Sequence, residues 1–268
     1  QEVQTTREAT FWGRISAQPV DSLSLALKLA HAKRDASDYR SVASIIAPQN
    51  PLLRKFNMAK RDRNSGELRA DITPAENVNL GVGIELASND FTGSSIGLTD
   101  SRSRALGADL SVAISDQTQV HAFAHTEQSR SNQAGSELFA APDWTGRSED
   151  TSNVAGVGIK HSALGGKLEI RADLVASRSR SELSVDASVP SAAFPNATTS
   201  LDSFKLGATY RLNDNLSLLA DYEHERFETR DWRLDGVLPT SVPSLIAFGE
   251  LAPRYSVNVV RVALRYRF

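Results

Sequence analysis

The sequence has 268 residues, with 30 Lys and Arg against 32 Asp and Glu, and its formal net charge is −2. This balance argues against a nucleic-acid-binding protein, which needs an excess of positive charge. Cysteine is absent, which excludes disulfides, thiolate metal sites and covalent attachment of haem c to this chain.

The length allows one large domain or two small ones. The longest apolar runs are short and interrupted, as by Lys28, and none resembles a membrane helix. The mean hydropathy of −0.30 fits a soluble protein or a membrane β-barrel, because only alternate residues of a barrel strand meet lipid. Residue 1 is Gln and the only Met is Met58. We therefore expect that translation starts upstream, and that a signal peptide or a longer segment was removed or not included.

Apolar and polar residues alternate along most of the chain with the period of two that is typical of β-strands. Five segments alternate strongly, at residues 23–29, 77–86, 104–114, 167–174 and 203–212. Five weaker segments lie at residues 11–17, 68–72, 120–126, 155–161 and 216–224. Together with the final segment "SVNVVRVALRYRF", this pattern predicts about eleven strands.

The connections between these strands alternate in length. The short ones read "AQPVDS", "TPAEN", "SDQTQ", "ALGGK" and "NDN". The long ones cover residues 35–64, 88–103, 128–152, 178–202 and 228–255, and they are rich in Ser, Asn, Pro and charged residues. Outer-membrane barrels have short periplasmic turns and long external loops. The sequence therefore predicts an all-β fold, an antiparallel transmembrane β-barrel.

The two faces of each predicted strand favour lipid over a soluble core. In residues 77–86, Leu80, Val82 and Ile84 share one face and Glu85 lies on the other. The apolar rows carry no charged residue, and strands of about ten residues cross a hydrocarbon layer when they are tilted. The alternative is a large soluble antiparallel β-protein with one solvated face.

An odd number of strands indicates that residues 1–268 are the C-terminal part of a single, larger outer-membrane barrel domain. Complete bacterial barrels normally have an even number of strands, with both termini in the periplasm. With short turns in the periplasm, the last strand ends at the periplasmic side. Tyr210, Tyr266 and Phe268 then lie near that end, where an interfacial aromatic girdle is expected.

Charged residues on the face opposite the apolar rows are candidates for contacts inside the lumen: Glu67, Arg69, Asp71, Glu85, Arg171, Arg211, Arg261, Arg265 and Arg267. A basic loop supplies candidates for contacts with a partner or with anionic lipid: Arg54, Lys55, Lys60, Arg61 and Arg63. Small residues on the inner face would let a guest approach the wall: Gly81, Gly83, Gly156, Gly158, Gly207 and Ala263. We expect no catalytic, metal-binding or cofactor-binding residue in this chain. His121 and His125 are about 13 Å apart on a strand and cannot share a metal.

The chain resembles a known family in several stretches. These are "NPLLRKFNMAKRDR" (residues 50–63), "DTSNVAGVGIKHSALGGKLEIRADL" (150–174), "YRLNDNLSLLADYEHERFETRDW" (210–232) and "YSVNVVRVALRYRF" (255–268). They are similar to the decahaem-associated outer-membrane porins of the MtrB/PioB type, found in metal-reducing and iron-oxidising bacteria. The ending also resembles the C-terminal signature that the outer-membrane assembly machinery reads, and this resemblance implies that role for Leu264, Tyr266 and Phe268.

This resemblance implies a barrel that acts as a sheath. In the family, the barrel surrounds a periplasmic multihaem c-type cytochrome in the outer membrane, and an extracellular multihaem cytochrome often docks outside. Electrons pass along the haems, so the haem c is carried by the partner and no cofactor is bound by this chain.

Three functions are open at this point. The first is a non-catalytic barrel for extracellular electron transfer, which serves metal reduction or iron oxidation. The alternative is a general or substrate-specific diffusion porin. The third is an outer-membrane enzyme, for which the sequence offers no convergent catalytic group.

Deletion of Phe268 tests the proposed assembly signal. We expect less of the barrel in the outer membrane with unchanged synthesis, measured by membrane fractionation against total protein. Normal assembly of the deletion variant would remove the assembly role from this residue.

Overall fold

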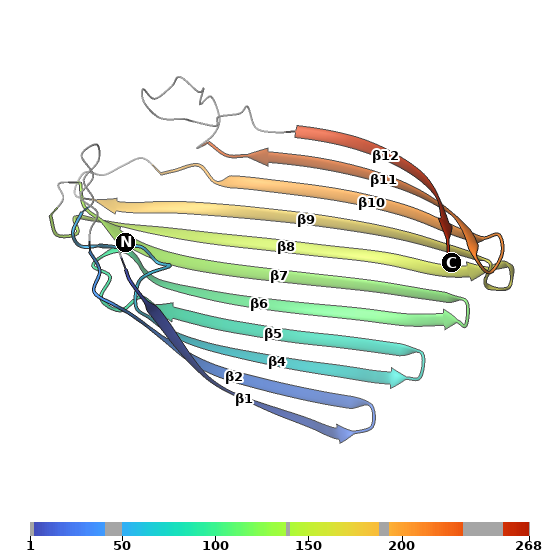
Figure 1. Ribbon diagram of the computed structural model, residues 1–268, viewed down its shortest axis with the longest axis horizontal. Helices are drawn as coiled ribbons and strands as arrows, with labels where there is room; N and C mark the ends of the chain where they lie inside the picture. Colours follow the sequence, from blue (N-terminus) through green and yellow to red (C-terminus); the bar gives the residue numbers. More distant parts are fainter. Residues whose placement is uncertain (1–2, 41–49, 138–139, 188–192, 233–253, 268) are drawn as a thin grey trace.

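The computed structural model describes residues 3–40, 50–137, 140–187, 193–232 and 254–267. Nearly all of them form strands of one sheet (Figure 1). The elements are β1 (Thr6–Val20), β2 (Leu23–Ala36), β3 (Leu53–Arg54), β4 (Arg61–Ala75), β5 (Val78–Asp90), β6 (Ile96–Ser115), β7 (Thr118–Gly135), β8 (Trp144–Ala163), the 3₁₀ turn η1 (Leu164–Gly166), β9 (Leu168–Ala187), β10 (Ala197–Arg211), β11 (Leu216–Arg230) and β12 (Arg254–Tyr266). In these residues no helix is both long enough and apolar enough to cross a membrane.

Every long strand pairs antiparallel with its neighbours in the sequence, in the order β1-β2-β4-β5-β6-β7-β8-β9-β10-β11-β12. The short β3 lies off this path and pairs parallel with β6. Figure 1 shows a single curved sheet with β1 and β12 at its two edges. The C-terminus lies at the end of the sheet with the short turns, and the N-terminus lies at the other end. The predicted all-β antiparallel fold and the eleven long strands are confirmed.

One face of the sheet is apolar, and we call it the apolar face. In β6 it carries Leu106, Leu110 and Ile114, which are 48%, 38% and 64% exposed. In the described part of the chain no second sheet and no helix covers this face, and no large side chain is fully buried. A soluble protein rarely exposes an apolar surface of this kind. The soluble β-protein is therefore the wrong alternative, and the apolar face is suited to contact with lipid.

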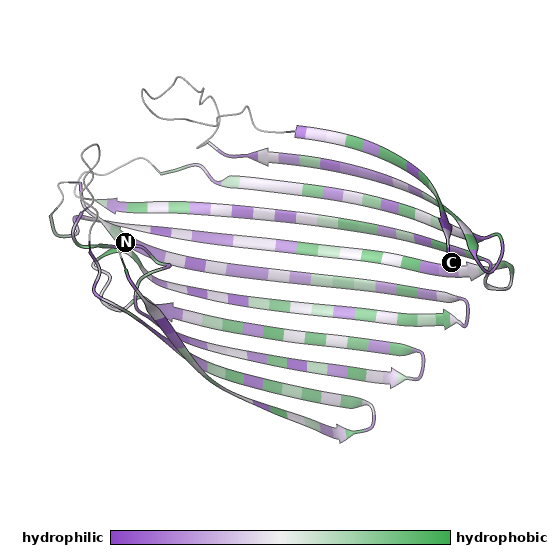
Figure 2. Ribbon diagram, viewed as in Figure 1, coloured by the Kyte–Doolittle hydropathy of each residue, from purple (hydrophilic) through white to green (hydrophobic). Residues whose placement is uncertain are grey.

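Apolar and polar positions alternate along the strands (Figure 2). On β6 the apolar row runs from Leu106 to Ile114, which is about 27 Å along the strand. A tilted transmembrane strand needs about 9–11 residues, and the nine residues from Leu106 to Ile114 meet that length.

Several strands extend well beyond this apolar band. The expected loops at residues 88–103, 128–152 and 178–202 are largely strand, because β6, β8 and β9 each run for 20 residues. The prediction was wrong there because both faces are polar in these extensions, and the period-two signal disappears. The backbone hydrogen bonds between strands do not depend on this alternation of hydropathy, so the strands continue through the extensions. The extensions all lie at the end of the sheet opposite the short turns (Figure 1).

A charge placed on the apolar face tests its contact with lipid. Leu110→Arg is expected to lower the free energy of unfolding by about 2–4 kcal/mol, because Leu110 lies in the middle of the apolar row. The neighbouring Ser111→Arg is the control, because Ser111 points to the opposite face, between Asn79 and His121. Urea titration of the barrel folded in phospholipid vesicles measures both. Equal losses for the two variants would contradict the assignment of the faces.

Candidate functional site

The face opposite the apolar face carries most of the charged residues of the central sheet, and we call it the polar face. Glu67, Arg69 and Asp71 of β4 lie on it at alternate positions. The register places Glu67 opposite Lys28 of β2 and opposite Glu85 of β5. A shift of one residue would move this whole row to the apolar face, so the two-sided pattern fixes the register.

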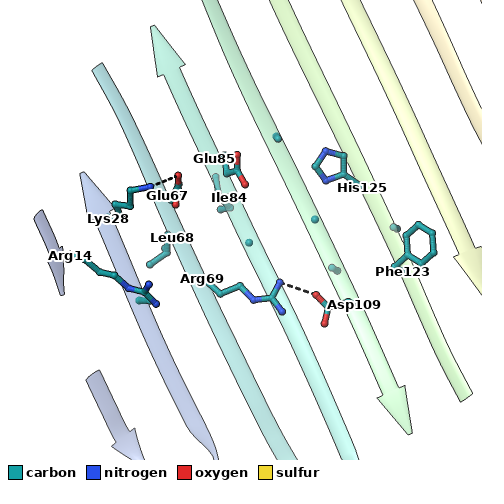
Figure 3. Close-up of a pocket in the computed structure, with 16 residues that line it drawn as sticks. Arg14, Lys28, Glu67, Leu68, Arg69, Ile84, Glu85, Asp109, Phe123 and His125 are labelled. Atoms are coloured by element: carbon teal, nitrogen blue, oxygen red, sulfur yellow. Dashed lines mark hydrogen bonds and ion pairs between the residues drawn. The ribbon is translucent and has the colours of Figure 1, made fainter. Parts of the chain in front are cut away.

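A hollow of about 420 Å³ lies on this face over β2, β4, β5, β6 and β7 (Figure 3). Lys28 Nζ lies 3.1 Å from Glu67 Oε1. Glu85 and His125 also line the hollow, and no ion pair neutralises Glu85 among the described residues. Arg14 of the edge strand β1 completes one side. The hollow therefore presents charges of both signs on one surface.

Arg69 reaches across a neighbouring strand to form an ion pair. Its Nη1 lies 2.8 Å from Asp109 Oδ1 of β6, and its Nε donates to Asp71 Oδ1 at 2.8 Å. Gly81 of β5 lies between the two strands, opposite Asp71 and Asp109. A Cβ atom on Gly81 would collide with the Arg69 guanidinium. The absence of a side chain there lets the guanidinium lie flat on the sheet.

The same arrangement recurs on β7, β8 and β9. His121 Nε2 lies 3.2 Å from Asp173 Oδ1, and Gly158 lies between them in the register. A Cβ atom on Gly158 would collide with both side chains. Gly81 and Gly158 therefore leave room for ion pairs between side chains of the two flanking strands.

Arg171 of β9 follows this pattern with a longer separation. It lies opposite Gly207, which lies opposite Asp221. The Nη2 of Arg171 is 4.0 Å from Asp221 Oδ1. Asp221 is in turn opposite Arg261 of β12. The structure thus brings Arg171 and Arg261 to either side of one carboxylate.

The remaining predicted arginines lie near the short-turn end. Arg211 of β10 and Arg265 of β12 both lie opposite Ser217 of β11. Arg267 follows the last strand, and its backbone N–H donates to Asn215 O at 2.9 Å. The predicted residues therefore fall into two groups, one around the hollow and one on β9 to β12. Their contact with a guest stays a prediction.

The expectation that the inner glycines give a guest access to the wall needs revision. Gly81 and Gly158 are covered by side chains of the adjacent strands, and Phe123 covers Gly156. At Gly83 an added Cβ atom would meet only ordinary contacts, with the nearest atom 3.7 Å away. Of these four positions, only Gly83 leaves the backbone approachable.

Two residues assigned to the basic loop lie in a strand instead. Arg61 and Arg63 belong to β4, so their assignment to the loop was wrong. Arg61 Nη2 lies 2.9 Å from Glu8 Oε2 of β1, and Arg63 Nη1 donates to Asn89 Oδ1 at 3.3 Å. The run of charged residues before Ser65 was interpreted as a loop, but β4 continues through it beyond the apolar band.

The other basic candidates lie in the segment 50–60. Arg54 belongs to β3, and its guanidinium lies 4.6 Å from the centre of the Tyr39 ring. Lys55 and Lys60 are exposed. Contact of these residues with a partner is untested.

Arg34 of β2 holds the segment 50–60 against the sheet. Its Nε donates to Ala59 O at 2.9 Å, and its Nη2 donates to Phe56 O. Ala59 and Ala32 are both buried, at 3% and 6% exposure. Because Arg34 lies on the polar face, this segment covers part of that face at the long-connection end. No pattern in the sequence indicates this contact, because it depends on how residues 50–60 fold back against β2.

Sequence analysis did not single out five other residues that form ion pairs on the polar face: Lys28, Asp109, His121, Asp173 and Asp221. All of them lie on the polar phase of their strands, so the period of two was a usable signal. Pairing them needs the register between strands.

The C-terminal candidates lie on the apolar face. Leu264 and Tyr266 alternate on β12 and are 68% and 56% exposed. Phe268 lies outside the described residues. No group of three or more His, Asp or Glu side chains suited to a metal ion occurs in the ranges that the structure describes.

Comparison with known proteins gives a family and a fold. The family model of the outer membrane beta-barrel porin, MtrB/PioB, matches residues 1–268. The chain is 29% identical over 268 residues to outer membrane protein MtrB of Shewanella baltica, and it spans 38% of that relative's length. Among solved structures, it is similar to the copper transporter OprC, with a TM-score of 0.66 at 12% identity, over 100% of this chain and 43% of that chain. It is also similar to BauA, the ferric preacinetobactin receptor of Acinetobacter baumannii, with a TM-score of 0.62 at 13% identity, over 97% and 44%. These two likenesses show the fold alone.

The glycine-spanning ion pair can be tested by two matched substitutions. Gly83→Ala is expected to stabilise the barrel by about 0.5–1 kcal/mol, because alanine loses less backbone entropy on folding. Gly81→Ala is expected to fall short of that gain by about 0.5–1 kcal/mol, because it displaces the Arg69 side chain from its ion pair. In a background with both Arg69→Ala and Asp109→Ala this difference should vanish, because the atoms nearest to an added Cβ atom at Gly81 belong to these two side chains. A difference of the same size in that background would show that the collision with Arg69 is not its cause. Unfolding titrations of the four variants measure the effect.

Proposed function

Because the chain belongs to the MtrB/PioB family of outer-membrane β-barrel porins, we propose that it forms part of a non-catalytic barrel around a multihaem c-type cytochrome. Electrons would cross the outer membrane along the haems of this partner. The observation that supports the proposal best is the polar face, which presents charges of both signs without neutralising all of them. The similarity to outer membrane protein MtrB agrees with it.

The unneutralised charges are suited to a protein guest. Glu85, Arg211 and Arg265 form no ion pair among the described residues. A small neutral solute would use such groups poorly, whereas a folded protein brings charges of the opposite sign. The guest would bring the haem, since this chain has no cysteine to attach it. The apolar face and the surrounding lipid would form the insulating wall.

The open edges support a larger barrel. Within the described ranges, β1 pairs only with β2, and β12 pairs only with β11. An edge strand in lipid leaves backbone N–H and C=O groups without partners, each at a cost of several kcal/mol. We propose that further strands of the same protein pair with both edges, and that residues 1–268 lie at the C-terminal end of that single barrel domain.

The lengths of the connections support one orientation in the membrane. Short turns lie on the periplasmic side of bacterial barrels, and the C-terminus lies at the short-turn end of the sheet (Figure 1). We place that end in the periplasm and the strand extensions outside the cell. Lys55 and Lys60 of the segment 50–60 would then lie at the outer rim, where an extracellular multihaem cytochrome can dock.

A diffusion porin is the second candidate, and the open hollow of about 420 Å³ favours it. The two candidates differ in what the lumen holds. A porin conducts solutes through a wet lumen, whereas a sheath is filled by its guest.

Purification of the full-length barrel under mild conditions separates them. The sheath predicts a haem-staining partner in the purified complex and little solute flux in liposomes. A barrel that purifies without cytochrome and passes small solutes freely would establish the porin.

A charge reversal on the polar face tests the contact itself. Glu85→Arg is expected to lower the haem retained per barrel after a salt wash, because it places a repulsive charge in the hollow. Asp62→Arg is the matched control, because Asp62 lies on the opposite face of β4. Equal haem retention by the two variants would place the guest away from Glu85.

A further inference from the structure

A Ser–Arg alternation recurs in three strand extensions. Residues 101–104 of β6 read Ser-Arg-Ser-Arg, residues 129–131 of β7 read Ser-Arg-Ser, and residues 177–181 of β9 read Ser-Arg-Ser-Arg-Ser. The period of two places all serines on the polar face and all arginines on the side that continues the apolar face. These arginines are Arg102, Arg104, Arg130, Arg178 and Arg180.

The arginines begin directly where the apolar band ends. Arg104 lies opposite Leu86 of β5 and two residues from Leu106, a spacing of about 7 Å along the strand. They follow the band at its long-connection end. In the membrane this position is the boundary between hydrocarbon and head groups.

A groove of about 690 Å³ lies on this outward side over β2 to β8. Leu29 and Leu86 contribute its apolar part and are 57% and 55% exposed. Arg102, Arg104 and Arg130 contribute its cationic part. One shallow surface thus joins exposed leucines to three guanidinium groups.

The positive charge of the groove is only partly neutralised. Arg102 lies directly opposite Arg130 in the register, and like charges at that position repel. Arg130 Nη2 lies 2.7 Å from Glu149 Oε1, but Arg147 binds the same carboxylate oxygen.

The other two guanidinium groups have no carboxylate. Arg104 Nε donates to the neutral Gln128 Oε1 at 2.8 Å. Arg102 has no ion pair or side-chain hydrogen bond within the described ranges. By contrast, Arg178 lies 2.6 Å from Asp202, and Arg180 lies 2.7 Å from Glu182. The groove is lined by three arginines and by two carboxylates, Glu149 and Asp150, so it keeps an excess of one positive charge. Arg102 and Arg104 are its two guanidinium groups that no carboxylate of the described residues neutralises.

We propose that this groove binds the head group of a phosphorylated glycolipid of the outer leaflet, a lipid with the chemistry of lipid A. Guanidinium groups bind phosphate oxygens in a bidentate manner, which an ammonium group does not match. Arg102 and Arg104 bind the phosphate, and an acyl chain packs on Leu29 and Leu86. The site rests on the proposed orientation, because only the outer leaflet holds this lipid at the long-connection end. It does not depend on the cytochrome, which would lie on the other face.

The test uses the full-length barrel with the double substitution Arg102→Gln and Arg104→Gln. The matched control is Arg226→Gln with Arg230→Gln, which removes two arginines from the same side of β11, outside the groove. Each protein is exchanged into detergent with bisphosphorylated lipid A, with dephosphorylated lipid A or with phosphatidylglycerol. Native mass spectrometry then counts the lipids retained.

We expect that bisphosphorylated lipid A is retained about tenfold less by the groove variant, through the loss of two charge-assisted contacts. Retention by the control should match the unsubstituted barrel, and dephosphorylated lipid A should bind weakly to all three. Equal retention by groove variant and control overturns the site. Equal retention of phosphatidylglycerol and lipid A by the unsubstituted barrel overturns the glycolipid assignment.

Two further readouts separate this proposal from the proposed function. Thr92→Cys and Asp214→Cys lie at the two ends of the sheet, and an impermeant maleimide on intact cells should label only Thr92→Cys. Labelling of Asp214→Cys alone would overturn the orientation and the lipid site with it. Haem retention should be the same in the groove variant and in the control, because the groove and the polar face lie on opposite sides of the sheet. A barrel that binds lipid A but purifies without cytochrome would refute the sheath and leave the lipid site standing.

Discussion

A strand in a membrane must satisfy every backbone hydrogen bond within the sheet while its side chains meet two different solvents. The rest of this structure depends on that constraint. The eleven long strands pair in sequence order, so each interior strand has partners on both sides. Their side chains then sort by phase across the apolar band, with Leu106, Leu110 and Ile114 on one face and Asp109 on the other. The sheet has no hydrophobic core of the usual kind in its described residues, as is expected of a barrel strand whose apolar side faces lipid.

The polar face holds many charged side chains on a single-layered sheet. Exposed ion pairs contribute little to the free energy of folding, so their main effect is on the shape and charge of this surface. Gly81 and Gly158 let Arg69 and His121 reach carboxylates two strands away. The side chains then lie flat on the sheet. A wall built in this way is smooth and still presents Glu85, which has no ion pair among the described residues.

The sequence predicted the features that depend on period and missed those that depend on register. Residues 104–114 showed the apolar row of β6, and "NDN" showed a turn. The strand extensions were missed because residues such as Ser101, Arg102 and Ser103 are polar on both faces and carry no alternation of hydropathy. Arg61 and Arg63 were assigned to a loop for the same reason, because the residues around them show no alternation of hydropathy. The Arg69–Asp109 pair could not be predicted because it needs the offsets of two strand pairs at once. The role of Gly81 needs, in addition, the path of a neighbouring side chain.

The central claim is that one face meets hydrocarbon and the other encloses a guest. Spin labels on single cysteines along β6 test it most directly, placed one at a time in a cysteine-free full-length barrel at Ala105, Leu106, Gly107, Ala108, Asp109, Leu110, Ser111 and Val112. The account predicts that the even-numbered positions are relaxed by oxygen dissolved in the membrane. The odd-numbered positions should be relaxed by a water-soluble nickel chelate, and should lose that relaxation when the cytochrome is bound. The absence of alternation would contradict the two-faced wall, and odd-numbered positions that stay open to the chelate in the complex would contradict the enclosed guest.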